Sequence, residues 1–208
     1  MKKTKAPISP APVPRSAVVR ASHEIRIIGG QWKRTKLQVA DQAALRPTPD
    51  RVRETLFNWL GQDLSGWRCV DAFAGTGVLG FEAASRGALD VLLVEQDGAL
   101  ASQLKATQLR LQAGAARVVR GDGVSALRQL SVGSVDLVFL DPPFGATLLD
   151  AAVAAAAGAI KESGCVYLEA AQAWSDDRLA SVGLCVHRHL KAGAVHAHLL
   201  RKTMPAHG

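Results

Sequence analysis

Residues 70–80 read VDAFAGTGVLG, a short apolar segment that leads into a glycine-rich turn. Its glycines, Gly75, Gly77 and Gly80, follow the pattern G-x-G-x-x-G, which is typical of a strand that turns into a helix around a nucleotide-containing cofactor. Glycine suits such a turn because the backbone bends sharply and the ligand approaches it closely. The segment predicts the first strand and helix of an α/β unit, and it leaves the class of cofactor open.

Strand and helix patterns alternate along the chain around this segment. Strands are predicted over residues 68–73, 91–95, 117–120, 135–140 and 165–169, and helices over 80–85, 99–112, 123–130 and 148–161. This alternation predicts a Rossmann-like, doubly wound and mostly parallel sheet. Residues 184–190 and 195–202 have strand patterns without a helix between them, so we expect an antiparallel hairpin joined by 191–194.

The N-terminal region has a different composition. Residues 1–22 are basic and rich in proline, which predicts a disordered arm. Two short strand patterns on either side of Gly29-Gly30 predict a β-hairpin with a glycine turn. We therefore expect a disordered arm at 1–22, a hairpin extension at 23–44 and one α/β domain at 45–208. The hairpin carries Arg26, Lys33, Arg34 and Lys36 around Trp32, which suits contact with RNA, although Trp32 could equally pack the hairpin onto the domain.

Residues 45–60 predict a helix that precedes the glycine loop. Thr48 is suited to the N-cap and Pro49 to the first helical position. Apolar residues recur with helical spacing, so we expect one buried face. That face is predicted to comprise Val52, Thr55, Leu56, Trp59 and Leu60.

Positive charge is concentrated at the beginning of the chain. The formal net charge is +7, but residues 1–53 hold twelve Lys/Arg against three Asp/Glu, a net of +9, whereas 54–208 hold thirteen against fifteen, a net of −2. A polyanionic partner would explain this asymmetry through contacts with phosphate. A tail that only improves solubility is the alternative, and we favour it for Lys2, Lys3 and Lys5. Phosphate contacts are expected from Arg26, Lys33, Arg34, Lys36, Arg46, Arg51 and Arg53.

Composition limits the protein class further. The chain of 208 residues is 48% hydrophobic and 21% charged, as in ordinary globular proteins. Its three cysteines are far apart without metal-type spacing, which fits a reducing compartment. No apolar stretch approaches the roughly 20 residues that span a bilayer. We expect a cytoplasmic monomer with one main domain.

Acidic residues near the glycine loop distinguish the cofactor classes. Asp71 lies four residues before Gly75, where it would repel the pyrophosphate of a dinucleotide and attract the ammonium and sulfonium of S-adenosylmethionine. Glu95 ends the next predicted strand and is placed to bind ribose hydroxyls. Asp122 follows the third strand, where it can meet the adenine amino group, cap the next helix, or do both. S-adenosylmethionine is therefore the expected cofactor.

Residues 141–144 read DPPF and directly follow the apolar strand at 135–140. Asp141 and the carbonyl of Pro142 offer acceptors for the two N–H bonds of an exocyclic amine, and neither proline carries a competing N–H donor. Phe144 offers a flat face on which a base can stack. A turn that merely ends the strand is the alternative. Together with a methyl donor, Asp141, Pro142, Pro143 and Phe144 predict methylation of an amine on a planar base.

Four segments resemble the bacterial 16S ribosomal RNA guanine-N2 methyltransferases of the RsmD type, within the class I S-adenosylmethionine-dependent methyltransferases. They are residues 25–30, 46–60, 71–80 and 141–144. The resemblance implies a seven-stranded sheet whose last strands are antiparallel. It also implies methyl transfer to N2 of one guanine of 16S rRNA, presented in an assembled small subunit or its precursor. The implied donor-site residues are Thr48, Asp71, Phe73, Gly75, Thr76, Gly77, Glu95 and Asp122.

Three other functions remain open on the sequence alone. A DNA adenine-N6 or cytosine-N4 methyltransferase uses a similar tetrapeptide, but it generally needs a larger target-recognition region. A nicotinamide-dependent oxidoreductase shares the glycine pattern, although Asp71 disfavours its pyrophosphate. A non-catalytic RNA-binding factor could keep the fold, but it would have no need of the intact tetrapeptide at 141–144.

Four histidines near the C-terminus pair with a spacing of two, His187 with His189 and His196 with His198. Each pair lies on one face of its predicted strand, so the four could approach a metal ion. Histidines on the surface of a strand pair are the more common arrangement, and amine methylation needs no metal. We therefore expect no metal site.

Overall fold

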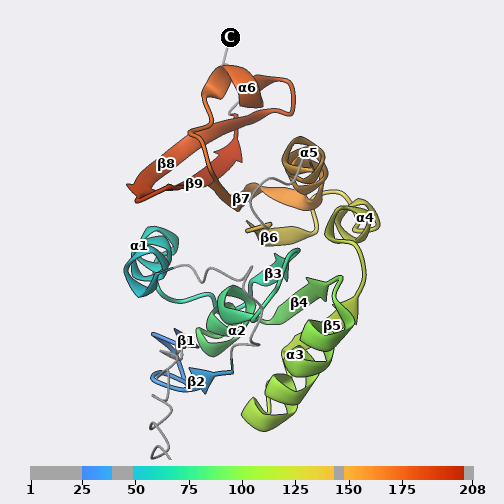
Figure 1. Ribbon diagram of the computed structural model, residues 1–208. Helices are drawn as coiled ribbons and strands as arrows, with labels where there is room; N and C mark the ends of the chain where they lie inside the picture. The colour runs from blue at the N-terminus through green and yellow to red at the C-terminus, as the bar shows by residue number, and fades with distance from the viewer. Residues whose placement is uncertain (1–24, 39–48, 143–147, 204–208) are drawn as a thin grey trace, which may run out of the picture.

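The computed structural model describes residues 25–38, 49–142 and 148–203, and Figure 1 shows their arrangement. A seven-stranded sheet has the order β5-β4-β3-β6-β7-β9-β8. Its strands are β3 (Arg68–Asp71), β4 (Asp90–Glu95), β5 (Ala116–Arg120), β6 (Val135–Leu140), β7 (Ile160–Ala170), β8 (Leu184–Ala192) and β9 (Val195–Lys202). The first five are parallel, and β9 pairs antiparallel with both β7 and β8. The predicted fold class is confirmed.

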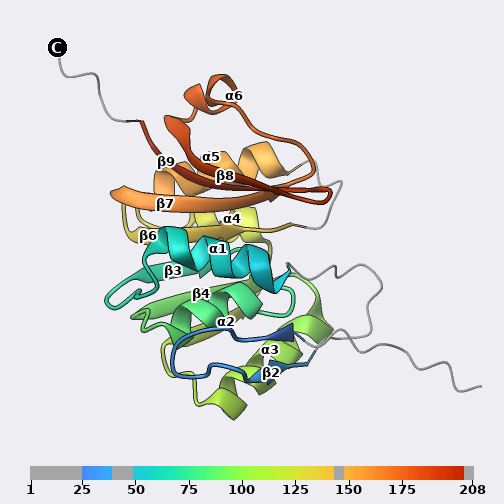
Figure 2. The same ribbon diagram turned by 90° about the vertical axis from the view of Figure 1, so that its left-hand side faces the viewer.

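Helices cover both faces of this sheet, as Figures 1 and 2 show. One face packs against α1 (Asp50–Leu60), α2 (Val78–Ser85) and α3 (Gly98–Leu111), and the other against α4 (Gly123–Arg128), α5 (Leu149–Ala159) and α6 (Asp176–Ala180). Strand alternation produces the two cores. Within β6, Phe139 joins the first core and Val138 the second, and all of β6 except its second residue is buried.

Helix α1 begins one position later than the sequence predicts. Pro49 is its N-cap, at φ −55° and ψ 144°, and no described side chain donates or accepts a capping hydrogen bond there. Thr48, the predicted cap, lies outside the described residues. The buried face also differs from the prediction, because Arg53 and Phe57 are fully buried while Thr55 and Trp59 are only half-buried.

The small N-terminal sheet pairs β1 (Ile25–Arg26) with β2 (Lys36–Leu37). The sequence predicts that Gly29 and Gly30 form the tip of a tight turn, but in the structure they do not. Gly30 instead touches the end of α2, where an added Cβ would meet the Ser85 carbonyl oxygen at 1.9 Å. The connecting loop is anchored there, since Gln31 N donates to Ser85 O at 2.8 Å and Trp32 N donates to Ser85 Oγ at 2.9 Å. Glycine is needed at position 30 both for this close packing and for its left-handed conformation, at φ 71°.

The C-terminal hairpin is longer and tighter than predicted. Ala192 pairs with Val195, so two residues form the turn instead of four. The short helix α6 precedes β8, and the sequence analysis did not predict it. Within the part of the chain that the structure describes, no helix has the length and apolar character needed to cross a membrane.

Candidate functional site

Four predicted site carboxylates follow the ends of four adjacent parallel strands. Asp71 ends β3 and Glu95 ends β4, whereas Asp141 follows directly after β6 and Asp122 follows β5 after one intervening residue. Strand β3 lies between β4 and β6, so the chain reverses its direction of winding there. Open α/β sheets bind ligands at the carboxyl ends of their strands beside such a switch point. The structure therefore brings these four positions to the edge where a ligand is expected.

The glycine loop has the geometry that its sequence pattern predicts. Gly75 and Gly77 adopt left-handed conformations, at φ 52° and 77°, and Gly77 is the N-cap of α2. Glu95 fixes this loop, because its Oε2 accepts from Gly75 N at 2.8 Å. The other oxygen of Glu95 accepts from Asp97 N at 2.8 Å. Thr76 and Phe73 are half-buried beside them. The loop thus presents backbone and polar groups at the carboxyl end of β3.

Asp71 is buried beneath this loop, with 2% of its surface exposed. Its Oδ2 accepts from Gly80 N at 3.0 Å, so the carboxyl group also holds the first turn of α2. Burial, and to a smaller extent the negative charge of Glu95, raises the pKa of Asp71 to about 7, and hydrogen bonds from the amides of Gly80 and Phe73 oppose this. The charged form is therefore costly, and a nearby positive ligand would favour it.

Asp122 is exposed at the start of α4. Its carboxylate accepts from Ser125 N at 2.7 Å and caps the helix, as the sequence allows. Hydrogen bonds from Ser125 lower the pKa of Asp122, so this group is ionised at neutral pH. The capping role is present in the structure, and one carboxylate oxygen of a cap can still accept a further hydrogen bond.

Only the first half of the DPPF segment is described. Asp141 is half-buried and Pro142 is buried, directly after the central strand β6. Pro143 and Phe144 lie outside the described residues, as do Thr48 and Arg46. The structure therefore places the two residues that would bind an amine, and it leaves the stacking residue as a prediction.

Two further polar residues lie beside this strand end and were missed by the sequence analysis. On β7, Tyr167 is fully buried and Glu169 is 5% exposed, and the Tyr167 hydroxyl donates to Glu169 Oε1 at 2.7 Å. Strand β7 is parallel to β6, with Phe139 opposite Tyr167. The sequence does contain a sign of this pair, because a glutamate interrupts the otherwise apolar run CVYLEA at 165–170.

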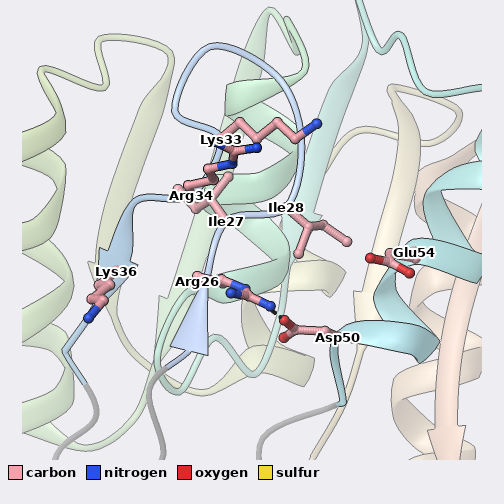
Figure 3. Close-up of a pocket in the computed structure, with 8 residues that line it drawn as sticks. All are labelled: Arg26, Ile27, Ile28, Lys33, Arg34, Lys36, Asp50 and Glu54. Atoms are coloured by element: carbon pink, nitrogen blue, oxygen red, sulfur yellow. Dashed lines mark hydrogen bonds and ion pairs between the residues drawn. The ribbon is translucent and has the colours of Figure 1, made fainter.

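A basic pocket of about 540 Å³ lies between the N-terminal sheet and α1 (Figure 3). The cationic side chains of Lys33 and Arg34 come from the connecting loop, and both residues are exposed. Arg26 points across the pocket to Asp50, with Nε 3.0 Å from Oδ2. Lys36 also lines the pocket. Four of the seven predicted phosphate-binding residues are thus gathered on one surface.

The prediction for Arg53 is wrong. Its side chain is fully buried, with Nη2 2.6 Å from Asp50 Oδ1 and Nη1 3.6 Å from Glu82 Oε2. A buried, ion-paired guanidinium cannot reach an external phosphate. Arg51, on the same helix, is exposed and stays a candidate. The sequence places both arginines on one helix, but it does not reveal that Glu82 lies under one of them.

Three of the four C-terminal histidines, His189, His196 and His198, form a stack of rings. The ring of His189 lies 5.1 Å from that of His196 and 4.6 Å from that of His198, nearly parallel to both. Buried His198 accepts from Trp174 N at 3.1 Å, and burial lowers the pKa of His198 to about 4. Among the described residues, no group of three His, Cys, Asp or Glu is arranged to hold a metal ion.

Comparisons with known proteins relate the chain to a sequence family. In Escherichia coli K12, "Ribosomal RNA small subunit methyltransferase D" is 50% identical over 129 residues, covering 62% of this chain and 65% of that protein. The protein of the same name from Haemophilus influenzae is 44% identical over 136 residues, covering 64% of this chain and 70% of that protein. The chain thus matches slightly less than two thirds of the Escherichia coli relative's length.

Structural comparison extends over more of the fold. The solved structure of the Escherichia coli protein yhhF is 39% identical and superposes with a TM-score of 0.73, covering 86% of this chain and 98% of that one. The sequence model of the family described as "Conserved hypothetical protein 95" matches residues 25–201. This chain therefore belongs to the conserved hypothetical protein 95 family, which confirms its resemblance to the RsmD type.

Proposed function

We propose that this protein transfers a methyl group from S-adenosylmethionine to the exocyclic N2 amine of a guanine in small-subunit ribosomal RNA. The observation that carries the proposal is the position of Asp141 and Pro142. They follow the central strand β6, next to the end of β3, where Asp71 and the glycine loop lie. The names of the two relatives, which refer to small-subunit ribosomal RNA, support the choice of substrate.

The donor pocket would be formed by the glycine loop and three carboxylates. S-adenosylmethionine supplies an electrophilic methyl group on a sulfonium. Asp71 would balance its positive charge, and the raised pKa of Asp71 fits a ligand that is a cation. Glu95 would bind the ribose hydroxyls after exchanging one of its backbone contacts, and Asp122 would accept from the adenine amino group. This acidic set of side chains suits a cationic donor better than a pyrophosphate.

The acceptor site would hold the amine for in-line attack. Asp141 and the Pro142 carbonyl would accept its two N–H bonds and direct the nitrogen lone pair toward the methyl carbon. The N–CH₃ bond forms as the S–CH₃ bond breaks, and the electron pair of that bond stays on sulfur. The amine then releases one proton, either to Asp141 or to water. Phe144 would stack on the guanine ring, with Pro143 shaping the turn.

RNA binding would involve the N-terminal hairpin and the start of α1. Arg26, Lys33, Arg34 and Lys36 line one pocket, and Arg51 is exposed nearby on α1. We propose that these residues and Arg46 contact phosphates, while the target guanine is splayed out of its helix toward Asp141. The chain offers little surface for reading sequence, so the shape of an assembled particle would select the guanine.

A labelled-methyl assay tests this proposal. The protein is incubated with labelled S-adenosylmethionine and with small subunits that lack N2-methylguanine, naked 16S rRNA, or duplex DNA, and the modified nucleoside is identified after digestion. We expect N2-methylguanosine, formed most rapidly with the particle. Methylated adenine or cytosine in DNA would instead support the alternative methyltransferase class. Thermal stabilisation by NAD and not by S-adenosylmethionine would exclude a methyl-donor pocket.

A further inference from the structure

Tyr167 and Glu169 form a buried polar pair next to the proposed catalytic strand end. Both side chains face the core that contains Phe139, and the Tyr167 hydroxyl lies 2.7 Å from Glu169 Oε1. The ring of Tyr167 is fixed by an edge contact with Phe139, with centroids 6.3 Å apart. Leu140, the last residue of β6, pairs with Leu168, and the residues that follow this pair along the chain are Asp141 and Glu169. Neighbouring strands are about 4.8 Å apart, so these carboxyl groups belong to one local site.

Charged groups around this strand end act on Tyr167. Burial raises the pKa of Tyr167 well above its usual value, and the negative charges of Glu169 and Asp141 raise it further. The positive charge of Arg53 lowers the pKa of Tyr167 in part. Tyr167 therefore stays protonated, and its hydroxyl donates a hydrogen bond to Glu169. This bond holds the Glu169 side chain in one orientation beside the end of β6.

Packing alone does not account for this pair. Burying a carboxylate is costly even when it is hydrogen-bonded, and apolar residues of similar volume often stabilise a core as well or better. Tyr167 lies among aromatic and aliphatic neighbours, where phenylalanine would fill the same space. A function at the neighbouring Asp141 would explain why a hydroxyl and a carboxylate are present there.

We propose that Tyr167 and Glu169 are positioning residues that hold a second negative charge beside Asp141 and stabilise the acceptor amine during methyl transfer. This inference rests on the proposed function, because it concerns the same reaction. As the S–CH₃ bond breaks and the N–CH₃ bond forms, positive charge moves from sulfur to the amine nitrogen. A fixed carboxylate in a water-poor site stabilises that charge without having to reorient. Glu169 supplies the charge, and Tyr167 fixes its position.

Two conservative variants test the pair. Glu169→Gln keeps the acceptor for Tyr167 and removes the charge, whereas Tyr167→Phe removes only the hydroxyl. We expect kcat for methyl transfer to fall by about 10- to 100-fold in Glu169→Gln and by less in Tyr167→Phe. The Kd for S-adenosylmethionine and the KM for the RNA particle should stay within about twofold, because neither residue is assigned to binding. The melting temperature should stay within about 4 °C of wild type.

Glu162→Gln is the matched control, since Glu162 lies near the other end of β7 with 84% of its side chain exposed. It should leave kcat unchanged. A wild-type kcat in both test variants would overturn the proposal. So would a fall in kcat that is accompanied by equal losses of donor binding and thermal stability, since that pattern indicates a purely structural role. If the wild-type protein itself methylates no rRNA guanine, the proposed function fails first, and the role of the pair falls with it.

Discussion

Arg53 and Glu82 form an ion pair in which both side chains are fully buried, with Nη1 3.6 Å from Oε2. Glu82 also accepts from Ile28 N at 2.7 Å and from Arg86 Nε at 2.9 Å. One carboxylate of α2 thus ties together helix α1 and the loop that follows β1. The basic pocket is built on this connection, although neither Arg53 nor Glu82 lines it.

Removing one partner of this pair should destabilise the protein strongly. Arg53→Met leaves the buried charge of Glu82 without one of its neighbouring cations. Breaking a buried ion pair in this way typically lowers the free energy of unfolding by about 3–5 kcal/mol. Urea denaturation measures the change in the free energy of unfolding. Arg51→Met on the same helix is the control, and it should change stability by less than about 0.5 kcal/mol because Arg51 is exposed. A stable Arg53→Met variant with weakened RNA binding would show that Arg53 reaches the RNA after all.

The salt dependence of RNA binding should identify the hairpin as a phosphate-binding surface. Replacing both Lys33 and Arg34 by Ala removes two exposed charges from the pocket. The slope of log Kd against log salt should become shallower by about 0.7–0.9 for each phosphate that the variant no longer binds. Arg188→Ala with Lys191→Ala removes the same charge from exposed positions on β8, the far edge of the sheet. If the slope falls equally in both double variants, net charge and not the hairpin governs binding.

The sheet and the order of its site residues could be predicted because they depend on local patterns. The strand at 135–140 is a run of six residues in which only one is polar, and its predicted bounds match β6. The glycine pattern likewise requires left-handed residues, which Gly75 and Gly77 provide. Once the strands alternate with helices, the carboxyl ends of parallel strands must meet at one edge.

The features that sequence patterns missed depend on contacts between distant segments. Arg53 looks like a surface cation until Glu82, 29 positions later, is placed beneath it. Gly30 fits a tight turn equally well until the carbonyl of Ser85 occupies the space beside it. Tyr167 and Glu169 acquire their proposed role only when β7 is aligned with β6. Periodicity carries no information about such pairings between elements.

Asp141 should be essential for methyl transfer and dispensable for donor binding. Asp141→Ala removes an acceptor for the amine, so kcat should fall by at least about 100-fold. Isothermal titration with S-adenosylmethionine should give a Kd within a few-fold of wild type, because Asp71, Glu95 and Asp122 are unchanged. Asp136→Asn, at the start of β6, is the matched control and should keep its activity. If Asp141→Ala keeps a near wild-type kcat, the role assigned to Asp141 is wrong.

The contribution of Asp71 to stability should fall as the pH rises from about 4 to about 7. The pKa of buried Asp71 is raised to about 7, above its value of 3.8 in an unfolded chain. In this window the folded state binds a proton that the unfolded state has lost, so the contribution of Asp71 decreases by about 1.4 kcal/mol per pH unit. Asp71→Asn keeps an acceptor for Gly80 N and removes the titration. The difference in unfolding free energy between variant and wild type, measured from pH 4 to 8, should show this trend.

Donor binding should show the opposite dependence on the same group. A cationic donor favours the ionised form of Asp71, so binding below pH 7 requires loss of its proton, and the affinity of wild type should rise as the pH increases from 6 towards 7. Titration in two buffers of different ionisation enthalpy would detect that proton release. Asp71→Asn should bind more weakly at pH 7.5 and release no proton from this position. If wild type and Asp71→Asn release the same number of protons, then Asp71 does not change its protonation state when the donor binds. Its buried carboxyl group would then serve only to hold Gly80 and the first turn of α2.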